Sequence, residues 1–196
     1  MIMKFYYGRV ELDVPERVYY PREDSELLAK VIDSLDLKGK AVLETGCGSG
    51  FLSILMAKKG ADVTAVDINT EAVEITGKNA AANGAKINTF ISDLFSAVGG
   101  TFDIIVFNPP YLPVEEGEND TTYAGGKTGR ETIERFVGEA KSHLNTGGFV
   151  LLLISSLTGE KEVSELLKNH GMSAEIISRE KVPWEELLII KAVPSF

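Results

Sequence analysis

The chain has 196 residues and carries 20 Lys and Arg against 29 Asp and Glu, a formal net charge of −9 at pH 7. This length suits one domain with a substantial core, and the acidic balance argues against a protein that neutralises nucleic-acid phosphates over a broad basic face. With 44% apolar and 25% charged residues, the composition excludes an intrinsically disordered chain.

The one cysteine, Cys47, excludes an internal disulfide framework and suits a reducing compartment, so we expect a cytoplasmic protein. The first residues lack the basic and apolar regions of a secretory signal, and no apolar run approaches the length of a membrane span. We therefore expect neither export nor membrane insertion. One cysteine and two histidines cannot build a tetrahedral zinc site, and we expect no bound metal.

Helical and strand-like segments alternate from about Ser25 onward, which predicts a mostly parallel sheet with helices on both faces. The first helix is predicted from an apolar stripe at helical spacing, formed by Leu27, Leu28, Val31, Ile32 and Leu35. A strand at 40–44 leads through a glycine cluster into a second helix that ends at Gly60. There follow a strand at 62–66, a helix at 70–82 that Asn83-Gly84 stops, and strands at 86–91 and 102–107.

The span 108–130 holds three prolines, several glycines and no apolar period, which predicts a long loop. After it we expect a helix with Ile133, Phe136, Val137, Ala140 and Leu144 on one face, a strand at 149–154, a helix around Val163, and an antiparallel pair near 173–179 and 187–191. Without repeats or linkers, the chain is expected to be one domain over 1–196, with a short N-terminal extension (1–24) and the sheet and helices in 25–193.

A glycine loop joins the first sheet strand to the second helix, within residues 42–50 (VLETGCGSG). Small residues there let the backbone approach a ligand, and doubly wound sheets bind cofactors at the carboxyl ends of such strands. A dinucleotide fingerprint would place a third glycine where this chain has Phe51. A nicotinamide or flavin site therefore fits poorly.

Three carboxylates accompany the glycine loop. Asp67 ends the second strand, 21 residues after Gly46, and can accept hydrogen bonds from both hydroxyls of a ribose, or else cap the helix that begins at Thr70. Asp93 follows the third strand and can accept from an adenine amino group, or else serve as a turn residue. Glu44 can orient the loop amides or meet an ammonium group. These three carboxylates suit a cationic ligand that contains ribose and adenine, and S-adenosylmethionine is such a ligand.

The sequence Asn108-Pro109-Pro110-Tyr111 follows the fourth strand, at the same edge of the sheet. Consecutive prolines remove two amide donors and leave a stiff loop with free carbonyls. The Asn108 side-chain oxygen and the Pro109 carbonyl can each accept one N–H of a planar amide or amino nitrogen, while Tyr111 stacks on the planar group. Such positioning helps a weakly nucleophilic nitrogen to attack a methyl donor. The alternative is an ordinary turn in which Tyr111 packs.

The E-x-G-C-G-S-G pattern with the following Asp67 resembles the class I methyltransferases. Their fold is a Rossmann-like, doubly wound α/β fold with a seven-stranded, mostly parallel sheet whose last strand is antiparallel. Two further blocks, 18–25 (VYYPREDS) and 124–131 (AGGKTGRE), together with N-P-P-Y, resemble the short HemK-like release-factor glutamine methyltransferases of eukaryotes and archaea.

This resemblance implies N5-methylation of the glutamine in the Gly-Gly-Gln loop of a termination (release) factor, with S-adenosylmethionine as donor and S-adenosylhomocysteine as product. It also implies a small zinc-binding activator protein that pairs with a sheet edge. Because N-P-P-Y is shared with enzymes acting on adenine N6 and guanine N2, a DNA or RNA methyltransferase, or one acting on lysine, stays the alternative. The net charge makes nucleic acid the weaker of these readings.

The resemblance also assigns the site. Residues that it places around the cofactor are Tyr20, Glu23, Asp24, Ser25, Glu44, Gly46, Cys47, Gly48, Gly50, Asp67, Ile68, Asp93, Leu94 and Asn108, and Asn108, Pro109, Pro110 and Tyr111 would hold the acceptor. Glu23-Asp24-Ser25 has the alternative of an acid-rich first helical turn. Cys47 is expected to be a packing residue rather than a nucleophile, and Trp184 is expected to pack near the sheet edge.

Overall fold

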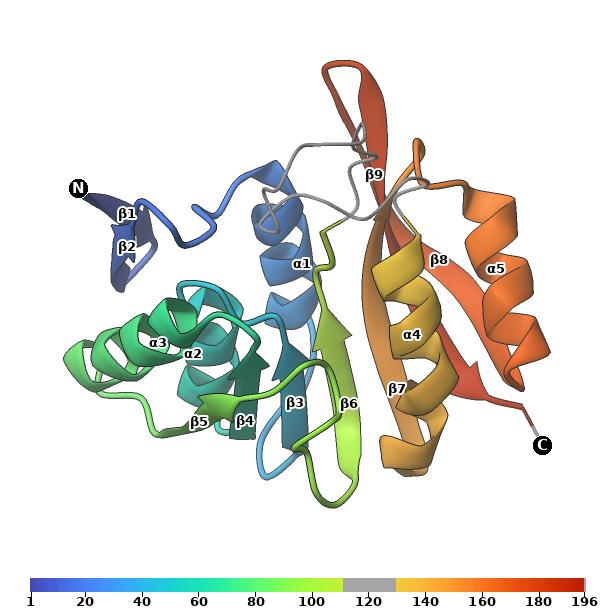
Figure 1. Cartoon of the computed structure of the whole chain (residues 1–196), viewed down its shortest axis with the longest axis horizontal. Coiled ribbons are helices and arrows are strands. Elements are labelled where there is room, and N and C mark those ends of the chain that lie inside the picture. The colour runs from blue at the N-terminus through green and yellow to red at the C-terminus, as the bar shows by residue number, and fades with distance from the viewer. Residues whose placement is uncertain (111–129, 196) are drawn as a thin grey trace.

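The protein is described here from a computed structural model, which covers residues 1–110 and 130–195. Its centre is a seven-stranded sheet with helices on both sides (Figure 1). In chain order the elements are β1 Ile2–Tyr7, β2 Val10–Pro15, α1 Glu23–Asp33, β3 Ala41–Thr45, α2 Phe51–Lys58, β4 Asp62–Asp67, α3 Thr70–Ala82, β5 Ile87–Ile91, β6 Phe102–Phe107, α4 Glu131–Ala140, a 3-10 turn Lys141–His143, β7 Leu144–Ser155, α5 Glu160–Asn169, β8 Met172–Val182 and β9 Glu185–Pro194.

The strands of the large sheet lie in the order β5-β4-β3-β6-β7-β9-β8. Every neighbouring pair from β5 to β7 is parallel, and β9, inserted between β7 and β8, is antiparallel to both. The predicted fold class, mostly parallel with the last strand reversed, is confirmed. The chain leaves β3 toward β4 and β5 and then returns to β6 on the other side, so the strand order reverses between β3 and β6. Open α/β sheets bind ligands at the carboxyl ends of strands at such a switch point.

Alternate residues of the central strands supply two separate cores. Val42 of β3 and Val106 of β6 pack with α1, α2 and α3 on one face, whereas Leu43 and Ile105, next to them in sequence, pack with α4 and α5 on the other. Because both faces are covered, these strands read as continuous apolar runs rather than as an alternating pattern. Among the described helices, none has the length and apolarity needed to cross a membrane.

The N-terminal extension contains an antiparallel hairpin, β1 and β2, that the sequence analysis did not predict. Its inward residues are buried against the helical layer, where the Phe5 ring meets the Phe51 ring edge-on at 4.9 Å. The Asn79 side chain of α3 bonds to the backbone of Asp13 in both directions, at 2.9 Å each. The extension is therefore fixed to the outside of α2 and α3 by packing and by hydrogen bonds.

Element boundaries differ from the sequence predictions at β7 and at the C-terminal hairpin. Leu144 is predicted on the face of the preceding helix but is the first residue of β7. The pairing of β6 with β7 shifts register near Phe102, and Gly148 of β7 lies close to the carbonyls of Phe102 and Asp103. The prediction for Trp184 was wrong. It lies at the turn between β8 and β9, is 97% exposed and packs against nothing in the described chain, because the two strands run beyond the helices that cover the sheet.

Candidate active site

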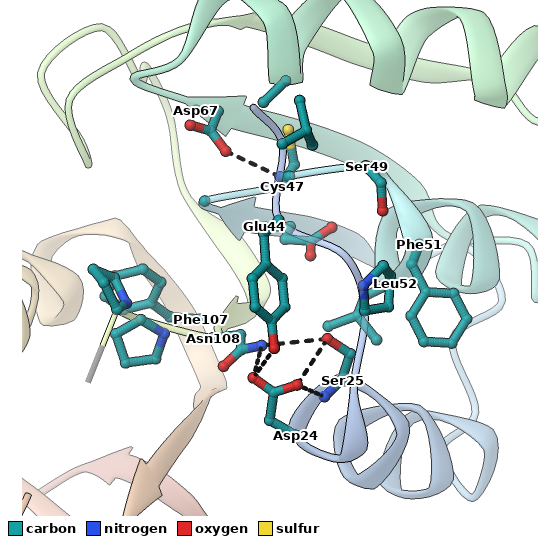
Figure 2. A pocket seen from close by; sticks show the side chains of 18 of the residues that line it. Asp24, Ser25, Glu44, Cys47, Ser49, Phe51, Leu52, Asp67, Phe107 and Asn108 are labelled. Carbon is teal, nitrogen blue, oxygen red and sulfur yellow. Dashed lines mark hydrogen bonds between the residues drawn. The ribbon is translucent and has the colours of Figure 1, made fainter. Parts of the chain in front are cut away.

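A cavity of about 490 Å³ lies at the switch point, between the carboxyl ends of β3 and β6 and the start of α1 (Figure 2). Its volume is in the range of small-molecule sites in proteins. Glycine-loop residues line one side, and the residues that follow β6 line another. The topology and the cavity therefore place the ligand site at the same edge of the sheet.

The glycine loop connects β3 to α2 by a tight turn in which the Gly50 amide donates to the Cys47 carbonyl at 2.8 Å. Gly50 has a positive φ of 84°, and a Cβ there would stand 2.9 Å from Thr76 of α3. Gly50 is thus required by its backbone conformation and by the close approach of α3, and it does not itself line the cavity. The neighbouring loop residues Gly46, Cys47 and Gly48 do.

Asp67, at the end of β4, is held by backbone donors. Its Oδ2 accepts from the Gly48 amide and its Oδ1 from the Asn69 amide, both at 2.9 Å. The alternative role of Asp67 as a helix cap does not hold, because Asn69 caps α3 by accepting from the Glu71 amide. Burial raises the pKa of Asp67, which these backbone donors partly offset. Asp67 therefore locks the glycine loop, and because it also lines the cavity, a ribose could bond to it.

Glu44 lies beneath the loop, 3% exposed, and accepts a short hydrogen bond from the Ser53 hydroxyl. Burial raises its pKa to about 8, with the nearby Asp67 adding to the rise and Ser53 opposing it. At neutral pH in the free protein Glu44 is therefore mostly protonated. A cationic ligand would favour its ionised form, which makes this buried carboxyl suited to a ligand with positive charge.

Asp93 and Leu94, which we expect near the cofactor, follow β5 and line the cavity. Asp93 forms an ion pair with Arg135 of α4, with 2.7 Å between Oδ2 and Nη2. Leu94 has a positive φ of 50°, uncommon for a residue with a side chain, and its carbonyl accepts from the Ser92 hydroxyl at 2.8 Å.

Ile68, directly after β4, also lines the cavity, and its apolar side chain is 66% exposed. Such a rim could pack on the flat face of a base.

Asn108 stands at the end of β6 with its side chain turned toward the start of α1. Its Nδ2 donates to Asp24 Oδ2 at 3.1 Å and to Ser25 Oγ at 3.4 Å, and Figure 2 shows these three side chains meeting at one end of the cavity. The Asn108 Oδ1 is buried and has no hydrogen-bond partner in the described part of the chain. A buried carbonyl without a donor costs free energy, so this atom is a candidate acceptor for a ligand N–H.

Most predicted site residues are brought together by the structure. The cavity-lining ones are Glu23, Asp24, Ser25, Glu44, Gly46, Cys47, Gly48, Asp67, Ile68, Asp93, Leu94, Asn108, Pro109 and Pro110. Tyr111 and most of the 124–131 block lie outside the described residues. Cys47 is buried and its thiol pKa is raised well above normal by burial, in keeping with a packing role.

Tyr20 does not line the cavity, contrary to the prediction. Its ring packs edge-on against Phe5 at 5.6 Å, and its hydroxyl donates to the Lys4 carbonyl at 3.0 Å, so it anchors the N-terminal hairpin. The preceding residue, Tyr19, lines the cavity instead, and its hydroxyl donates to Asp24 Oδ2 at 2.6 Å. In the segment before α1 these two neighbouring side chains therefore have different partners, and the sequence pattern alone did not show which of them reaches the cavity.

Sequence reasoning also missed residues that reach the cavity from distant elements. Arg17 comes from the segment before α1 and Arg135 from α4, while Val182, Glu185 and Leu187 come from the β8 and β9 hairpin. None belongs to a recognisable motif, because their positions depend on how the C-terminal hairpin and α4 pack onto the sheet. Together with the motif residues, they enclose a site with carboxylates on one side and a stiff Asn-Pro-Pro segment on another.

Comparison with known proteins shows which methyltransferases the chain is similar to. Residues 23–181 match the family described as methyltransferase small domain. A Methanocaldococcus jannaschii protein named as a protein N5-glutamine methyltransferase is 49% identical over 189 residues, which cover 93% of this chain and 95% of that protein. Mouse methyltransferase HEMK2 is 32% identical over 181 residues, with 85% of each chain covered.

Among solved structures, the chain resembles one from E. cuniculi, the Mtq2-Trm112 complex responsible for methylation of the translation termination factor eRF1. The TM-score is 0.77 at 30% sequence identity, and the alignment covers 91% of this chain and 99% of that one. These similarities extend over nearly the whole of each protein compared, so they concern the entire fold and not only the glycine loop.

Proposed function

The chain belongs to the methyltransferase small domain family, and from that premise we propose that it methylates the side-chain amide nitrogen of a glutamine in a translation termination factor. The observation that carries this proposal is the Asn108 side chain, which lines the cavity and whose buried Oδ1 has no donor among the residues that the structure describes. A carboxamide substrate has two N–H donors on one planar nitrogen, and the Asn108 oxygen can accept one of them.

The donor side of the cavity fits S-adenosylmethionine. We propose that Asp67 accepts from the ribose hydroxyls, that Asp93 and Ile68 meet the adenine, and that Glu44 and the loop amides lie near the amino acid portion. When bound, the cofactor supplies a methyl group on a cationic sulfur, which leaves as the neutral thioether of S-adenosylhomocysteine. The carboxylates of Asp67 and Asp93 and the buried Glu44 account for the affinity toward a cationic, ribose-bearing molecule.

The acceptor side positions the nucleophile. An amide nitrogen is weakly nucleophilic because its lone pair is delocalised, so orientation supplies much of the rate enhancement. The Asn108 Oδ1 and the Pro109 carbonyl each accept one N–H of the substrate amide, which directs the nitrogen lone pair toward the methyl group. The nitrogen forms the new bond to carbon, and its proton leaves to solvent after the charge has developed, so no general base is needed beforehand. Tyr111 would stack on the substrate amide.

We further propose that the protein acts in the cytoplasm with a small zinc-binding activator subunit. The E. cuniculi relative was solved as a complex with a second protein, Trm112. In this chain the outer strands of the sheet are β5 and β8, and Ile91 of β5 is 50% exposed. An outer strand offers unpaired backbone groups to a partner. Activity of the isolated chain, with and without such a subunit, tests this part of the proposal.

The function is tested by a labelled-methyl transfer assay with three acceptors: the termination factor, the same factor with its loop glutamine changed to asparagine, and duplex DNA. We expect label on the unmodified factor alone. Label on DNA alone would replace the proposal with the alternative, an amino-methyltransferase acting on nucleic acid. Label on both forms of the factor would place the methyl group at another residue, such as lysine.

A further inference from the structure

Asp24 is almost completely buried, at 3% exposure, in the first turn of α1, and its carboxylate acts only as a hydrogen-bond acceptor. Its Oδ1 accepts from the Ser25 amide at 2.6 Å and the Ser25 hydroxyl at 3.2 Å. Its Oδ2 accepts from the Tyr19 hydroxyl at 2.6 Å and from Asn108 Nδ2 at 3.1 Å. Both oxygens are thus occupied by neighbouring groups of the protein itself.

A carboxylate can only accept hydrogen bonds, whereas a carboxamide has one donating and one accepting end. Asp24 therefore dictates that Asn108 presents its NH2 group to α1. A rotation of the Asn108 amide by half a turn would set its carbonyl against the carboxylate, oxygen facing oxygen. Ser25 Oγ reinforces the same orientation, since it accepts from Asn108 Nδ2 while donating to Asp24. With the NH2 end held, the buried Oδ1 of this cavity-lining residue is left without a donor in the described part of the chain.

We propose that Asp24 is a positioning residue that locks the Asn108 carboxamide in the one orientation able to accept an N–H from the substrate, with Ser25 as a second contact. This inference rests on the proposed function, because it gives Asn108 Oδ1 its acceptor role. It differs from the role implied by the resemblance, in which Asp24 and Ser25 border the cofactor. Because both Asp24 oxygens are already engaged within the protein, its effect is on transfer and not on cofactor affinity.

The first variant is Asp24→Asn, which keeps the shape and removes the charge. An asparagine has one carbonyl oxygen, so it can serve either the Ser25 amide or the Tyr19 and Asn108 donors, and the Asn108 orientation is no longer dictated. We expect kcat for the termination factor to fall about 100-fold, as loss of orientation does elsewhere. The cofactor Kd, measured by calorimetry, should stay within about threefold, a change of less than 1 kcal/mol.

The matched control is Glu26→Gln. It makes the same change of charge in the same helical turn, at a half-buried position that does not line the cavity. Its kcat should stay within about twofold of the unmodified protein, as expected for a substitution away from the site. A comparable loss in Glu26→Gln would mean that the charge of the α1 start, and not the contact with Asn108, controls transfer.

The decisive variants exchange the two partners. Asn108→Asp alone sets two carboxylates against each other, so transfer should be nearly lost. Adding Asp24→Asn restores a donor opposite an acceptor. The new amide at position 24 donates to one oxygen of the new carboxylate at position 108, and the other oxygen of that carboxylate is left for the substrate N–H. We expect the exchanged pair to be at least about tenfold more active than Asn108→Asp alone, as coupling between contacting residues requires.

The outcomes separate this inference from the function on which it rests. Absence of methyl transfer to the termination factor by the unmodified protein would refute the proposed function itself. Transfer by the unmodified protein, with an exchanged pair no better than Asn108→Asp, would overturn only the positioning role of Asp24. A large rise in cofactor Kd for Asp24→Asn, with kcat preserved at saturating cofactor, would also overturn it and return Asp24 to the cofactor site.

Discussion

The two sides of the cavity are built in different ways. The donor side, formed by Glu44, the 46–50 loop and Asp67, belongs to one β-α-β unit, and the Gly48 and Asp67 that lock it are 19 residues apart. The acceptor side joins Asn108 at the end of β6 to Asp24 at the start of α1, 84 residues away. One side is therefore set by local chain geometry, and the other by how distant elements pack.

Because the two sides are built independently, we expect binding of the donor and positioning of the acceptor to be separable properties of the chain. A substitution on the donor side should change cofactor affinity with transfer preserved at saturation. A substitution on the acceptor side should change transfer with cofactor affinity preserved.

The largest effect is expected for Asn108→Ala, on the acceptor side. It removes the oxygen that we assign to the substrate N–H, and preorganised hydrogen-bonding groups of this kind are worth about 100- to 1,000-fold in kcat. Cofactor affinity should be nearly unchanged, because the donor side does not depend on this amide. Steady-state kinetics and calorimetry on the same preparation check the pair of values. Equal losses of binding and turnover would contradict the assigned role.

The next effect is expected for Asp67→Ala, on the donor side. The variant removes the acceptor for the Gly48 and Asn69 amides together with the proposed bonds to ribose. Hydrogen bonds to a charged group are worth about 1.5–3 kcal/mol, so the cofactor Kd should rise about 10- to 100-fold. At saturating cofactor, kcat should recover to near its original value. A kcat that stays low at saturation would show that the two sides are not separable.

A smaller effect is the pH dependence of cofactor binding through Glu44. Its pKa in the free protein is about 8, and a cation nearby would lower it, so binding at pH 7 should release a proton. As the pH increases toward 8, cofactor affinity should rise by up to about tenfold per pH unit, and above pH 8 it should level off. Calorimetry in buffers of different ionisation enthalpy measures the released proton. In Glu44→Gln the dependence should be much weaker, and a flat profile in the unmodified protein would contradict the role.

The same group predicts how the stability of the free protein varies with pH. Because the folded-state pKa of about 8 lies above the ordinary value of 4.5, the folded protein holds a proton that the unfolded chain releases. The contribution of Glu44 to the free energy of unfolding is thus full below about pH 4.5 and lost as pH rises through 8. Burial raises the pKa of Asp67 in the same direction. Urea unfolding of Glu44→Gln should show a shallower decline between these values.

The smallest effect is expected for Arg135→Gln, which removes the ion pair with Asp93. Both side chains are about half exposed, at 56% and 42%, and exposed ion pairs contribute about 0–1 kcal/mol. Cofactor affinity should therefore change by no more than about fivefold, with kcat unaffected. A loss as large as that of Asp67→Ala would show that Arg135 itself contacts the ligand, and that the donor side extends to α4.

The contrast between the two sides also explains what could be predicted from sequence. The glycine loop, Asp67 and the Asn108 segment were predicted because a short motif next to a strand end fixes their positions. The sheet, including the reversed last strand, followed from the alternation of segments and from the resemblance. These features depend on neighbouring residues, which a sequence pattern records directly.

Features that depend on tertiary packing were not predicted. Tyr19, rather than Tyr20, lines the cavity because Tyr20 packs against Phe5 of the N-terminal hairpin, whose position depends on tertiary packing. That hairpin had a readable signal, namely a two-residue turn at Gly8 followed by the alternating apolar residues of β2. By contrast, no local pattern indicates that Arg135 reaches the cavity or that Trp184 stays exposed, because both depend on where α4 and the β8 and β9 hairpin pack.

In the proposed function, the cavity between the glycine loop and Asn108 methylates a glutamine side chain of the termination factor. The most direct test is fragmentation mass spectrometry of the factor after incubation with the purified chain and S-adenosylmethionine, with and without the proposed activator subunit. We predict one methyl group on the side-chain nitrogen of the glutamine in the Gly-Gly-Gln loop. A methyl group on any other residue of the factor, or an unmodified factor beside methylated nucleic acid, would contradict it.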